Sequence, residues 1–515
     1  MDNYFVSSCK RVKDWICRQF GQKEKKTVHH KKFANGGEVI VWETGRAGEE
    51  AASYENLFLR KEIAGFRTNI RREQSCSIKS LTRDYLYKQL LSSGEYTFDH
   101  MLVIKDPYGE APLTALALFI LEEPARVRVT TKGNLEVTDF VTELPKKKEH
   151  RVPILGMYAE KANDIVIEIL DDEGNCVKSH TFTIRTKRLP KSLRNVITVK
   201  KWTDKPAYSN IMINGGVKIH TCVFDIEGKI RYYLSRKPRG YGIFPLSDGH
   251  FFYMEKYISV PSYSNPQTVE SYDMDYFGRV FRTYLTEKGV HHTAEEKAGG
   301  NILTGSNSML EHTEDCVIEI DRQTGEIVWQ LNMAEIFDET YQNMMDWCHV
   351  NSDAYYEKDR TILISLRNVH AVICVDYDTK KLRWILSDPK FWEGTKMTPY
   401  LLQPEGDVKW CYQQHAAFEI ALPDESNPQK KRIIVYDNHW AKRRKAKSFD
   451  KDPLSYVSFY DIDEEKKTVS LHKRFAGPKT RIRANGIYVP DKKRVYNMAG
   501  SYAEPVGGAG GGGLF

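Results

Sequence analysis

Residues 372–386, VICVDYDTKKLRWIL, decide the fold class of this chain. An apolar run rich in β-branched residues ends in an aspartate, a short polar turn follows, and a second apolar run begins. This pattern is typical of two antiparallel strands joined by a tight turn. The same pattern recurs at VFDIEGKIRYYL (223–234), YDMDYFGRVFRTY (272–284), VIEIDRQTGEIVWQL (317–331) and FYDIDEEKKTVSLHKRF (459–475). The chain from about residue 196 onward is therefore predicted to consist of repeated β-units.

The spacing of these units predicts the architecture. Their aspartates lie at positions 225, 275, 321, 376 and 461, with steps of 50, 46, 55 and 85 residues. A period near 50 residues corresponds to one four-stranded propeller blade. The longest step has room for one more blade, with RIIVYDNHW (432–440) as its inner strand. We predict an all-β core that forms a six-bladed β-propeller over residues 193–503, followed by a Gly-rich tail at 504–515.

The first 192 residues divide into two parts. Residues 96–192 contain short runs such as DIVIEILD and SHTFTIRT with the turn DDEGN between them, and we predict a small β-sandwich domain there. Residues 1–95 are richer in helix formers, with candidate helices at 48–64 and 76–92. We therefore predict a mainly helical N-terminal extension.

Composition and charge exclude several classes of protein. The chain has 515 residues, of which 41% are hydrophobic and 28% charged, a balance typical of globular proteins. Its longest apolar run, residues 113–121, is too short to span a bilayer. Of the net charge of +7, +6 lies in residues 1–36, so the remainder is nearly neutral and a nucleic-acid partner is not expected.

The basic N-terminal segment carries apolar residues at helical spacing. They are Phe5, Cys9, Val12, Ile16 and Phe20. Such a helix either makes a weak contact with a membrane surface or docks on the protein itself. The segment lacks the apolar core and cleavage site of a secretory signal, and the nine cysteines form no CxxC pair. The expected location is therefore the cytoplasm, with reduced thiols.

Histidines and one arginine recur near equivalent positions of successive predicted blades. They are His291 and His292, His349, Arg367, and His415. A propeller brings such positions together at its central channel, so a shared anion or metal site is expected. Zinc sites often include a carboxylate or cysteine. An arginine instead favours an oxyanion, because its guanidinium matches such oxygens in a two-pronged geometry. No P-loop, strand-linked GxGxxG or GxSxG motif is present.

Four segments of the chain resemble one known family. DPYGEAPLTALALF (106–119), the segment from DWCHVNS to LRWIL (346–386), CYQQHAAF (411–418) and RIIVYDNHW (432–440) are similar to motifs of the bacterial aryl-sulfate sulfotransferases, which work without the nucleotide sulfate donor PAPS. The resemblance extends from about residue 97 to about residue 503. It implies a six-bladed propeller behind a β-sandwich, a homodimer, no cofactor and no metal, with an aryl sulfate donor and a phenol acceptor.

The resemblance also implies roles for individual residues. His415 corresponds to the nucleophile that accepts the sulfuryl group in a ping-pong reaction through a sulfo-histidine. His292, His349, Asn351 and Arg367 correspond to the sulfuryl-binding set, in which either histidine would exchange protons with the phenols. His291 is the alternative to His292, although alignment back from Gly300 favours His292. We also expect Gln413 or Gln414 to orient the His415 ring.

Some features depart from the family pattern and leave alternatives open. The best-known members are exported and carry a disulfide near the nucleophile, whereas Cys411 has no cysteine nearby in the sequence. Residues 1–95 match nothing in the family, and relatives continue with more strands at the C-terminus, so the N-terminal region is a candidate to complete the last blade. The alternatives for function are a non-catalytic anion-binding or scaffold propeller and a metal-dependent lyase or hydrolase.

Overall fold

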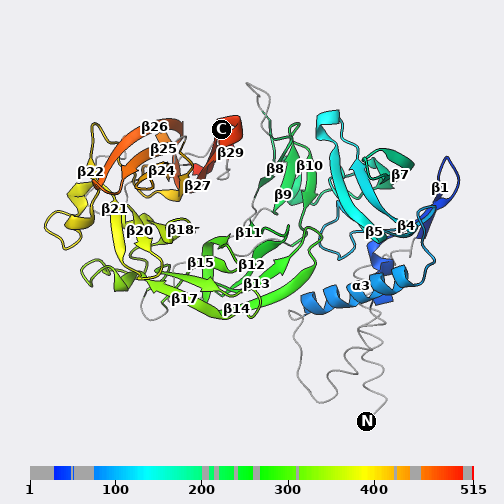
Figure 1. Cartoon of the computed structure of the whole chain (residues 1–515), viewed down its shortest axis with the longest axis horizontal. Helices are drawn as coiled ribbons and strands as arrows, with labels where there is room; N and C mark the ends of the chain where they lie inside the picture. The colour runs from blue at the N-terminus through cyan, green and yellow to red at the C-terminus, as the bar shows by residue number, and fades with distance from the viewer. Residues whose placement is uncertain are drawn as a thin grey trace, which may run out of the picture. The chain divides into compact units, whose positions relative to one another are not determined.

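In the computed structural model, nearly all regular secondary structure of the described residues is β-strand (Figure 1), which confirms the all-β core. The structure describes residues 28–47, 50–51, 75–199, 208–213, 220–236, 242–258, 267–308, 312–422, 426–440, 454–502 and 513–514. The amphipathic segment at residues 5–20 and most of the candidate helix at 48–64 lie outside these residues. None of the described helices combines the length and apolar character that crossing a bilayer requires.

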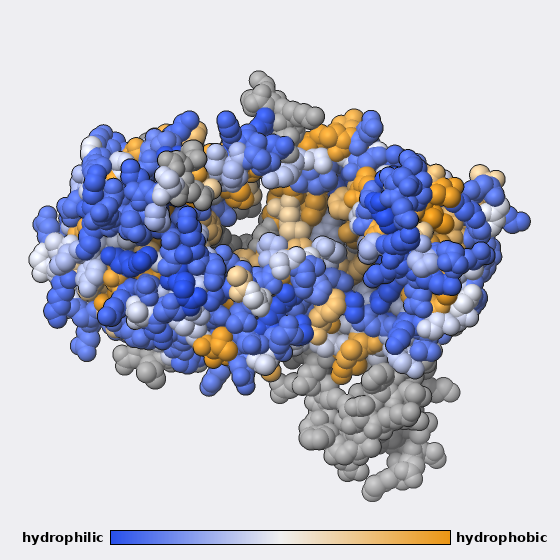
Figure 2. All heavy atoms as spheres, in the orientation of Figure 1, coloured by the Kyte–Doolittle hydropathy of each residue, from blue (hydrophilic) through white to orange (hydrophobic). Residues whose placement is uncertain are grey.

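The chain divides into two compact units. The first comprises Met1–Ile213, Ile219–Arg236 and Asp275–Phe281, and the second comprises Asn214–Lys218, Lys237–Met274 and Arg282–Phe515. The visible surface is predominantly hydrophilic, with small apolar areas between the polar ones (Figure 2).

A seven-stranded sheet forms the body of the first unit. Its strands are β1 (Val28–Lys32), β2 (Glu38–Trp42), β3 (His100–Lys105), β4 (Ala115–Thr131), β6 (Ala162–Leu170) and β7 (Cys176–Arg185) in that order, with β5 (Phe140–Ile154) paired to β4. Met101 and Val103 of β3 face one apolar cluster, whereas Leu102 and Ile104 face another. The second cluster includes Leu86, Tyr87 and Leu91 of helix α3 (Ser75–Ser92), so this helix covers one face of the sheet.

The prediction of a mainly helical N-terminal extension is correct for α3 but wrong for residues 28–42. This segment is a β-hairpin whose second strand, β2, pairs in parallel with β3. The run EVIVW favours a strand because its β-branched residues pack well on a pleated surface. Gly36 and Gly37 turn the chain at φ 93° and 88°, and a Cβ on Gly37 would lie 2.2 Å from the Asp99 carbonyl oxygen. These described strands therefore extend the first unit's sheet and do not complete a later one.

The first unit also contains a small antiparallel sheet. It consists of β8 (Asn210–Ile213), β9 (Cys222–Asp225) and β10 (Ile230–Tyr233), with β9 in the middle. The β9–β10 hairpin is the first of the repeated units predicted from the sequence.

The second unit contains four sheets of mostly antiparallel strands. The first sheet runs through β11 (Gly242–Pro245), β12 (Phe251–Ile258), β13 (Gln267–Met274), β14 (Val280–Glu296), β15 (Ile302–Ser306), β16 (Cys316–Ile320) and β17 (Ile327–Asn332). The next comprises β18 (Val350–Tyr356), β19 (Thr361–Leu366), β20 (Ala371–Asp376) and β21 (Leu382–Leu386). The third comprises β22 (Gln403–Pro404), β23 (His415–Ile420), β24 (Lys430–Asp437), β25 (Leu454–Asp463) and β26 (Thr468–Pro478). The last comprises β27 (Thr480–Val489), β28 (Arg494–Tyr502) and β29 (Gly513–Leu514).

Successive sheets of this unit pack face to face. Ile362 and Ile364 of β19 belong to a cluster with residues of β15–β17, whereas Leu363 belongs to a cluster with residues of β24. Both faces of β19 are therefore buried, which explains why three apolar residues, Ile362 to Ile364, follow one another in it. The hairpin quoted at 372–386 forms β20 and β21, as predicted.

Strands of successive sheets contact one another. The strand β18 contacts β15 and β23, and β27 contacts β23 and β24. The predicted inner strand at 432–440 is β24, the partner of β23. His349 directly precedes β18, His415 begins β23, and His291 and His292 lie within β14.

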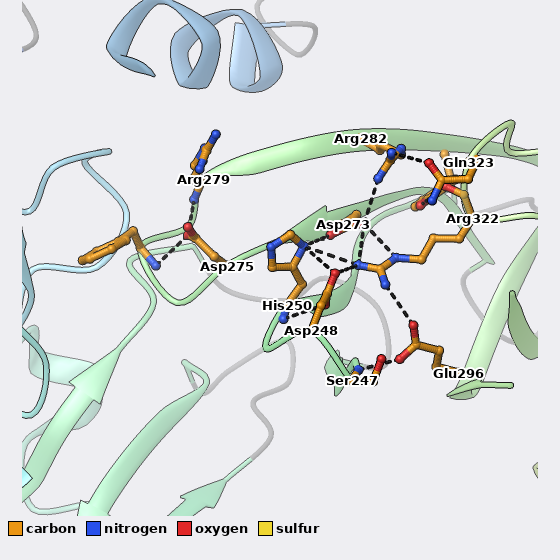
Figure 3. Close-up of polar contacts among 12 residues, drawn as sticks. Ser247, Asp248, His250, Asp273, Asp275, Arg279, Arg282, Glu296, Arg322 and Gln323 are labelled. Carbon is orange, nitrogen blue, oxygen red and sulfur yellow. Dashed lines mark hydrogen bonds and ion pairs between the residues drawn. The ribbon is translucent and has the colours of Figure 1, made fainter. Parts of the chain in front are cut away.

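A buried ion-pair network connects the β11–β12 turn, β13 and the β16–β17 turn (Figure 3). Arg322 donates to Asp273 at 2.9 Å, to Glu296 at 2.9 Å and to Asp248 at 2.7 Å. Asp273, whose side chain is fully buried, also contacts Nδ1 of His250 at 2.6 Å. Burial acts against its charge, but His250 and Arg322 hold the pKa of Asp273 below its ordinary value. The buried charge of Asp273 is therefore paired, and removal of a partner would leave it uncompensated.

Candidate active site

The same backbone irregularity occurs in several strands of the second unit. The strand register shifts between His291 and Ala294, between Val350 and Ser352, and between His415 and Phe418. His292 and Ala416 lie within two of these shifts, with φ of 61° and 51°, and His349, with φ of 56°, directly precedes the third. A left-handed backbone costs a non-glycine residue about 1–3 kcal/mol and occurs preferentially at functional sites, where a bulge redirects a side chain. This repeated distortion marks the candidate site.

The predicted site residues come from three neighbouring sheets of the second unit. His291 and His292 lie in β14, His349 directly precedes β18, and Asn351 lies in it. Arg367 follows β19, and His415 begins β23. The ring centroids of His292 and His349 are 5.0 Å apart. The charges of Arg367 and His349 both lower the pKa of His415. Asn351 donates from Nδ2 to the Gln414 carbonyl oxygen at 2.8 Å. The structure thus brings all six residues into one group.

Nδ1 of His415 contacts a side-chain amide oxygen. Its Nδ1 lies 2.6 Å from Oδ1 of Asn438, whose Nδ2 in turn donates to Oγ1 of Thr480 at 2.9 Å. Because the Asn438 amide donates to Thr480, its oxygen faces His415, so the His415 proton belongs on Nδ1 and the lone pair on Nε2. Burial and then the charge of Arg367 lower the pKa of His415 to about 3. The imidazole is therefore neutral at physiological pH.

Sequence reasoning missed Asn438 and Thr480. Of the two residues expected to orient His415, Gln414 donates from Nε2 to the carbonyl oxygens of Leu366 and Ala371. The backbone of Gln413 forms a hydrogen bond with His415, and its N–H donates to His370. Asn438 lies in the segment RIIVYDNHW, so the motif itself was a signal for it. Thr480 follows no motif, and only the position of β27 beside β23 reveals its role.

His349 is flanked by two carboxylates, of which the sequence predicted neither. Oε2 of the fully buried Glu314 lies 2.5 Å from Nδ1 of His349, and the two Asp346 oxygens lie 3.0 Å from the same nitrogen. Burial works against a charged ring, but Glu314 and Asp346 raise the pKa of His349 to about 9. The charge of His349 likewise holds the pKa of Glu314 well below its ordinary range despite its burial.

His291 and His292 differ in their surroundings. His291 is fully buried, with Nε2 2.8 Å from the Ser306 carbonyl oxygen, and a Cβ on Gly305 would lie 2.6 Å from its ring. Its Nδ1 lies 3.1 Å from Nδ1 of His292, whose ring in turn packs against His349. Burial lowers the pKa of both histidines. His292 is thus the member of the pair nearer to His349.

Among the described residues, His292, Glu314 and His349 place possible metal-ligating atoms within 4.8 Å of one another. Two imidazoles and a carboxylate are donors that zinc accepts. However, Nδ1 of His349 and Oε2 of Glu314 are only 2.5 Å apart, closer than two ligands on one ion at the usual bond lengths of about 2.0–2.2 Å. This contact is an ion pair between a proton donor and a carboxylate.

Comparison with known proteins assigns the family. Residues 195–504 match the model of the arylsulfotransferase (ASST) family, and residues 102–187 match the arylsulfotransferase Ig-like domain. Arylsulfate sulfotransferases AssT from Escherichia coli O6:H1 and from Lelliottia amnigena are each 22% identical over 493 residues, covering 71% of this chain and 78% of the relative. Among solved structures, an auxiliary nutrient binding protein from Bacteroides thetaiotaomicron aligns over 75% of this chain and 91% of its own, with a TM-score of 0.34 and 11% identity. The match over most of the second unit shows that this chain belongs to the arylsulfotransferase family.

Proposed function

We propose that this protein transfers a sulfuryl group from an aryl sulfate to a phenol, without PAPS, through a sulfo-histidine on His415. The observation that carries the proposal is the state of His415: a buried, neutral imidazole with Nδ1 bonded to Asn438, beside the cation Arg367. A neutral ring nitrogen with an available lone pair is a nucleophile, and a fixed cation nearby stabilises the negative charge of the sulfuryl oxygens.

The reaction proceeds in two displacements. Nε2 of His415 attacks sulfur, the S–O bond to the aryl group breaks, and the phenolate takes a proton and leaves as a phenol. A second phenol then loses its proton and attacks the same sulfur, and the N–S bond breaks to regenerate His415. The transition states, by analogy with phosphoryl transfer, are loose and spread charge over the equatorial oxygens.

The remaining site residues bind the transferred group. Arg367, Asn351 and His292 supply donors for the sulfuryl oxygens, and His292 or His349 exchanges protons with the phenols. In the sulfo-histidine the ring carries positive charge, and Oδ1 of Asn438 stabilises it by accepting the hydrogen bond from Nδ1–H.

The predictions for the domains, the oligomeric state and the membrane contact remain proposals alongside this function. We propose a six-bladed propeller over residues 193–503, a β-sandwich over residues 96–192, a homodimer, and a weak membrane contact of residues 1–36. Grouping the strands as β8–β10, β11 to the first half of β14, the second half of β14 to β17, β18–β21, β23–β26 and β27–β29 supports six blades.

We also keep the cytoplasm as the proposed location. The described cysteines are free thiols, including Cys411, whose Sγ lies 3.1 Å from the Tyr460 hydroxyl. The protein should therefore keep its activity and melting temperature in dithiothreitol, and loss of either would indicate a structural disulfide and export.

The experiment that tests the function uses 4-nitrophenyl sulfate and phenol with no nucleotide. The wild-type protein should form phenyl sulfate, and without acceptor it should gain one SO₃ unit of about 80 Da on the peptide containing His415. His415→Asn should abolish both the adduct and the burst of 4-nitrophenol. The matched control is His472→Asn in β26, since His472 is exposed and lies outside the site.

Three outcomes would contradict the proposal. Absence of transfer would leave a non-catalytic anion-binding propeller, and loss of activity after metal chelation would favour a metal-dependent enzyme. An adduct on another histidine in His415→Asn would reassign the nucleophile.

A further inference from the structure

We infer that Glu314 is the positioning residue of the acid–base group: together with Asp346 it holds the His349 imidazole so that its Nε2–H serves the leaving and entering phenols. This inference rests on the proposed function and deepens it, because neither the family resemblance nor the sequence motifs assigned any role to Glu314 or chose between His292 and His349 as the proton donor.

The first support is geometric. Both carboxylates contact the same ring nitrogen of His349: Oε2 of Glu314 lies 2.5 Å from Nδ1, and the Asp346 oxygens lie 3.0 Å from it. The two nitrogens of an imidazole lie on opposite sides of the ring, so Nε2 is directed away from the carboxylates. The carboxylates therefore fix both the ring orientation and the nitrogen that exchanges protons.

The second support is the position of Glu314 itself. Its side chain is fully buried, and its backbone has φ of 55°, in the left-handed region. Its N–H donates to Oδ1 of Asn307 at 2.8 Å, and its carbonyl oxygen accepts from Val350 at 2.7 Å. Val350 directly follows His349, so the backbone of β18 and the carboxylate of Glu314 hold the histidine from two sides. A buried carboxylate is costly unless its charge is paired, and His349 supplies that charge.

The third support is the electrostatic contrast between the two candidate histidines. His349 is charged at neutral pH, because its two carboxylates raise its pKa to about 9. Burial instead lowers the pKa of His292, which is therefore neutral. Only a protonated ring can donate to a departing phenolate, so His349 is the donor of the pair. Several titratable groups on the surrounding elements interact electrostatically with His349: Glu314, Asp346, His291, His292 and His415.

His349 gives up one proton in the first half-reaction and regains one in the second. When the S–O bond of the donor breaks, the Nε2 proton of His349 moves to the phenolate oxygen, and the ring becomes neutral beside its two carboxylates. The acceptor phenol then returns a proton to Nε2 as its oxygen attacks the sulfo-histidine. His349 ends protonated and His415 ends with its Nε2 lone pair, so no further reactant is needed.

The test compares leaving groups. Glu314→Gln keeps the size of the side chain and removes its charge, so His349 should lose much of its acid function. With phenyl sulfate, whose phenolate is a poor leaving group, kcat/KM should fall by about 10²–10³. With 4-nitrophenyl sulfate, whose nitro group spreads the charge of the departing phenolate, the fall should be less than about 10-fold. Glu314→Asp, which retains the charge, should restore part of the phenyl sulfate activity.

The matched control is Glu319→Gln. Glu319 is a buried carboxylate in β16, paired with Lys297 at 2.5 Å, outside the site. Its loss should affect both substrates equally. A second measurement does not depend on activity. The ¹⁵N resonances of His349 should show a protonated ring at pH 8 in the wild type and a neutral ring in Glu314→Gln. If the Glu314→Gln variant does not fold, Asp346→Asn serves as the second variant.

The outcomes separate the two proposals. If the wild type transfers no sulfuryl group, the proposed function fails. If the wild type is active but Glu314→Gln loses the same factor with both donors and His349 stays protonated, the role of Glu314 is wrong and the proposed function stands.

Discussion

Nδ1 of His415 and Oδ1 of Asn438 lie 2.6 Å apart, although 23 residues separate them in the sequence. They lie at the start of β23 and just after the end of β24, which pair antiparallel, so the hairpin brings both residues to the same end. This contact selects the His415 tautomer and leaves Nε2 to react. It also provides the first prediction.

Asn438→Leu should slow sulfuryl transfer by about 10²-fold, because the ring loses the acceptor that fixes its tautomer and position. The measure is the rate of 4-nitrophenol release in a single turnover. Thr480→Val, which removes only the partner of the Asn438 amide, should have a smaller effect in the same direction. An unchanged rate in Asn438→Leu would show that the contact does not orient the nucleophile.

Arg367→Lys should lower kcat/KM by about 10²–10³ while the melting temperature stays near that of the wild type. Lysine keeps the charge but loses the two-pronged donor geometry that matches sulfuryl oxygens. Arg360→Lys is the matched control, since Arg360 lies seven residues earlier with an exposed side chain. Near-full activity of Arg367→Lys would remove Arg367 from the anion site.

The activity towards phenyl sulfate should fall as pH rises through about 9, because His349 then loses the proton it donates. Across neutral pH the profile should be flat, since His415 takes up a proton only near pH 3. The same titration affects stability: the raised pKa of His349 stabilises the fold below its ordinary value of 6.5, and this contribution is lost as pH rises through about 9. A basic limb near pH 6.5 would show that the carboxylates do not raise the pKa of the acid.

Gly305→Ala should destabilise the protein by about 1–3 kcal/mol and reduce transfer, since the new Cβ would lie 2.6 Å from the His291 ring, which packs on His292. The check is a double-mutant cycle with His291→Ala measured by chemical denaturation. Removal of the ring should relieve the clash, so the two changes should be non-additive. Additive effects would show that Gly305 acts elsewhere.

Arg322→Leu should lower the free energy of unfolding by about 3–5 kcal/mol, because it leaves the buried Asp273 charge without its arginine partner. Lys409→Leu breaks an exposed pair with Asp407 and should cost less than about 1 kcal/mol. The free energies of unfolding of both variants are to be measured by urea denaturation and compared. Equal losses would mean that the network in Figure 3 does not stabilise the sheet through charge.

The sequence by itself determined the local units and the reactive side chains. The strand–turn–strand pattern at 372–386 predicts β20 and β21, because alternation of strand and turn residues depends on near neighbours. The motifs around His349, Arg367 and His415 singled out residues that the structure brings together. The segment 28–42 was assigned wrongly, because its β2 strand pairs with β3 about 60 residues later, and no local pattern records such a partner.

Only the tertiary structure decided the orientation and the protonation state of the reactive histidines. Glu314 precedes His349 by 35 residues and lies in the connection between β15 and β16, yet its carboxylate reaches Nδ1 of the histidine. Asn438 reaches His415 through the register of β23 and β24. Both pairings depend on strand register and sheet packing, which bring distant residues within hydrogen-bonding range. Burial then lowers the pKa of His415, and the added carboxylates raise that of His349, so that two histidines of one site take opposite protonation states.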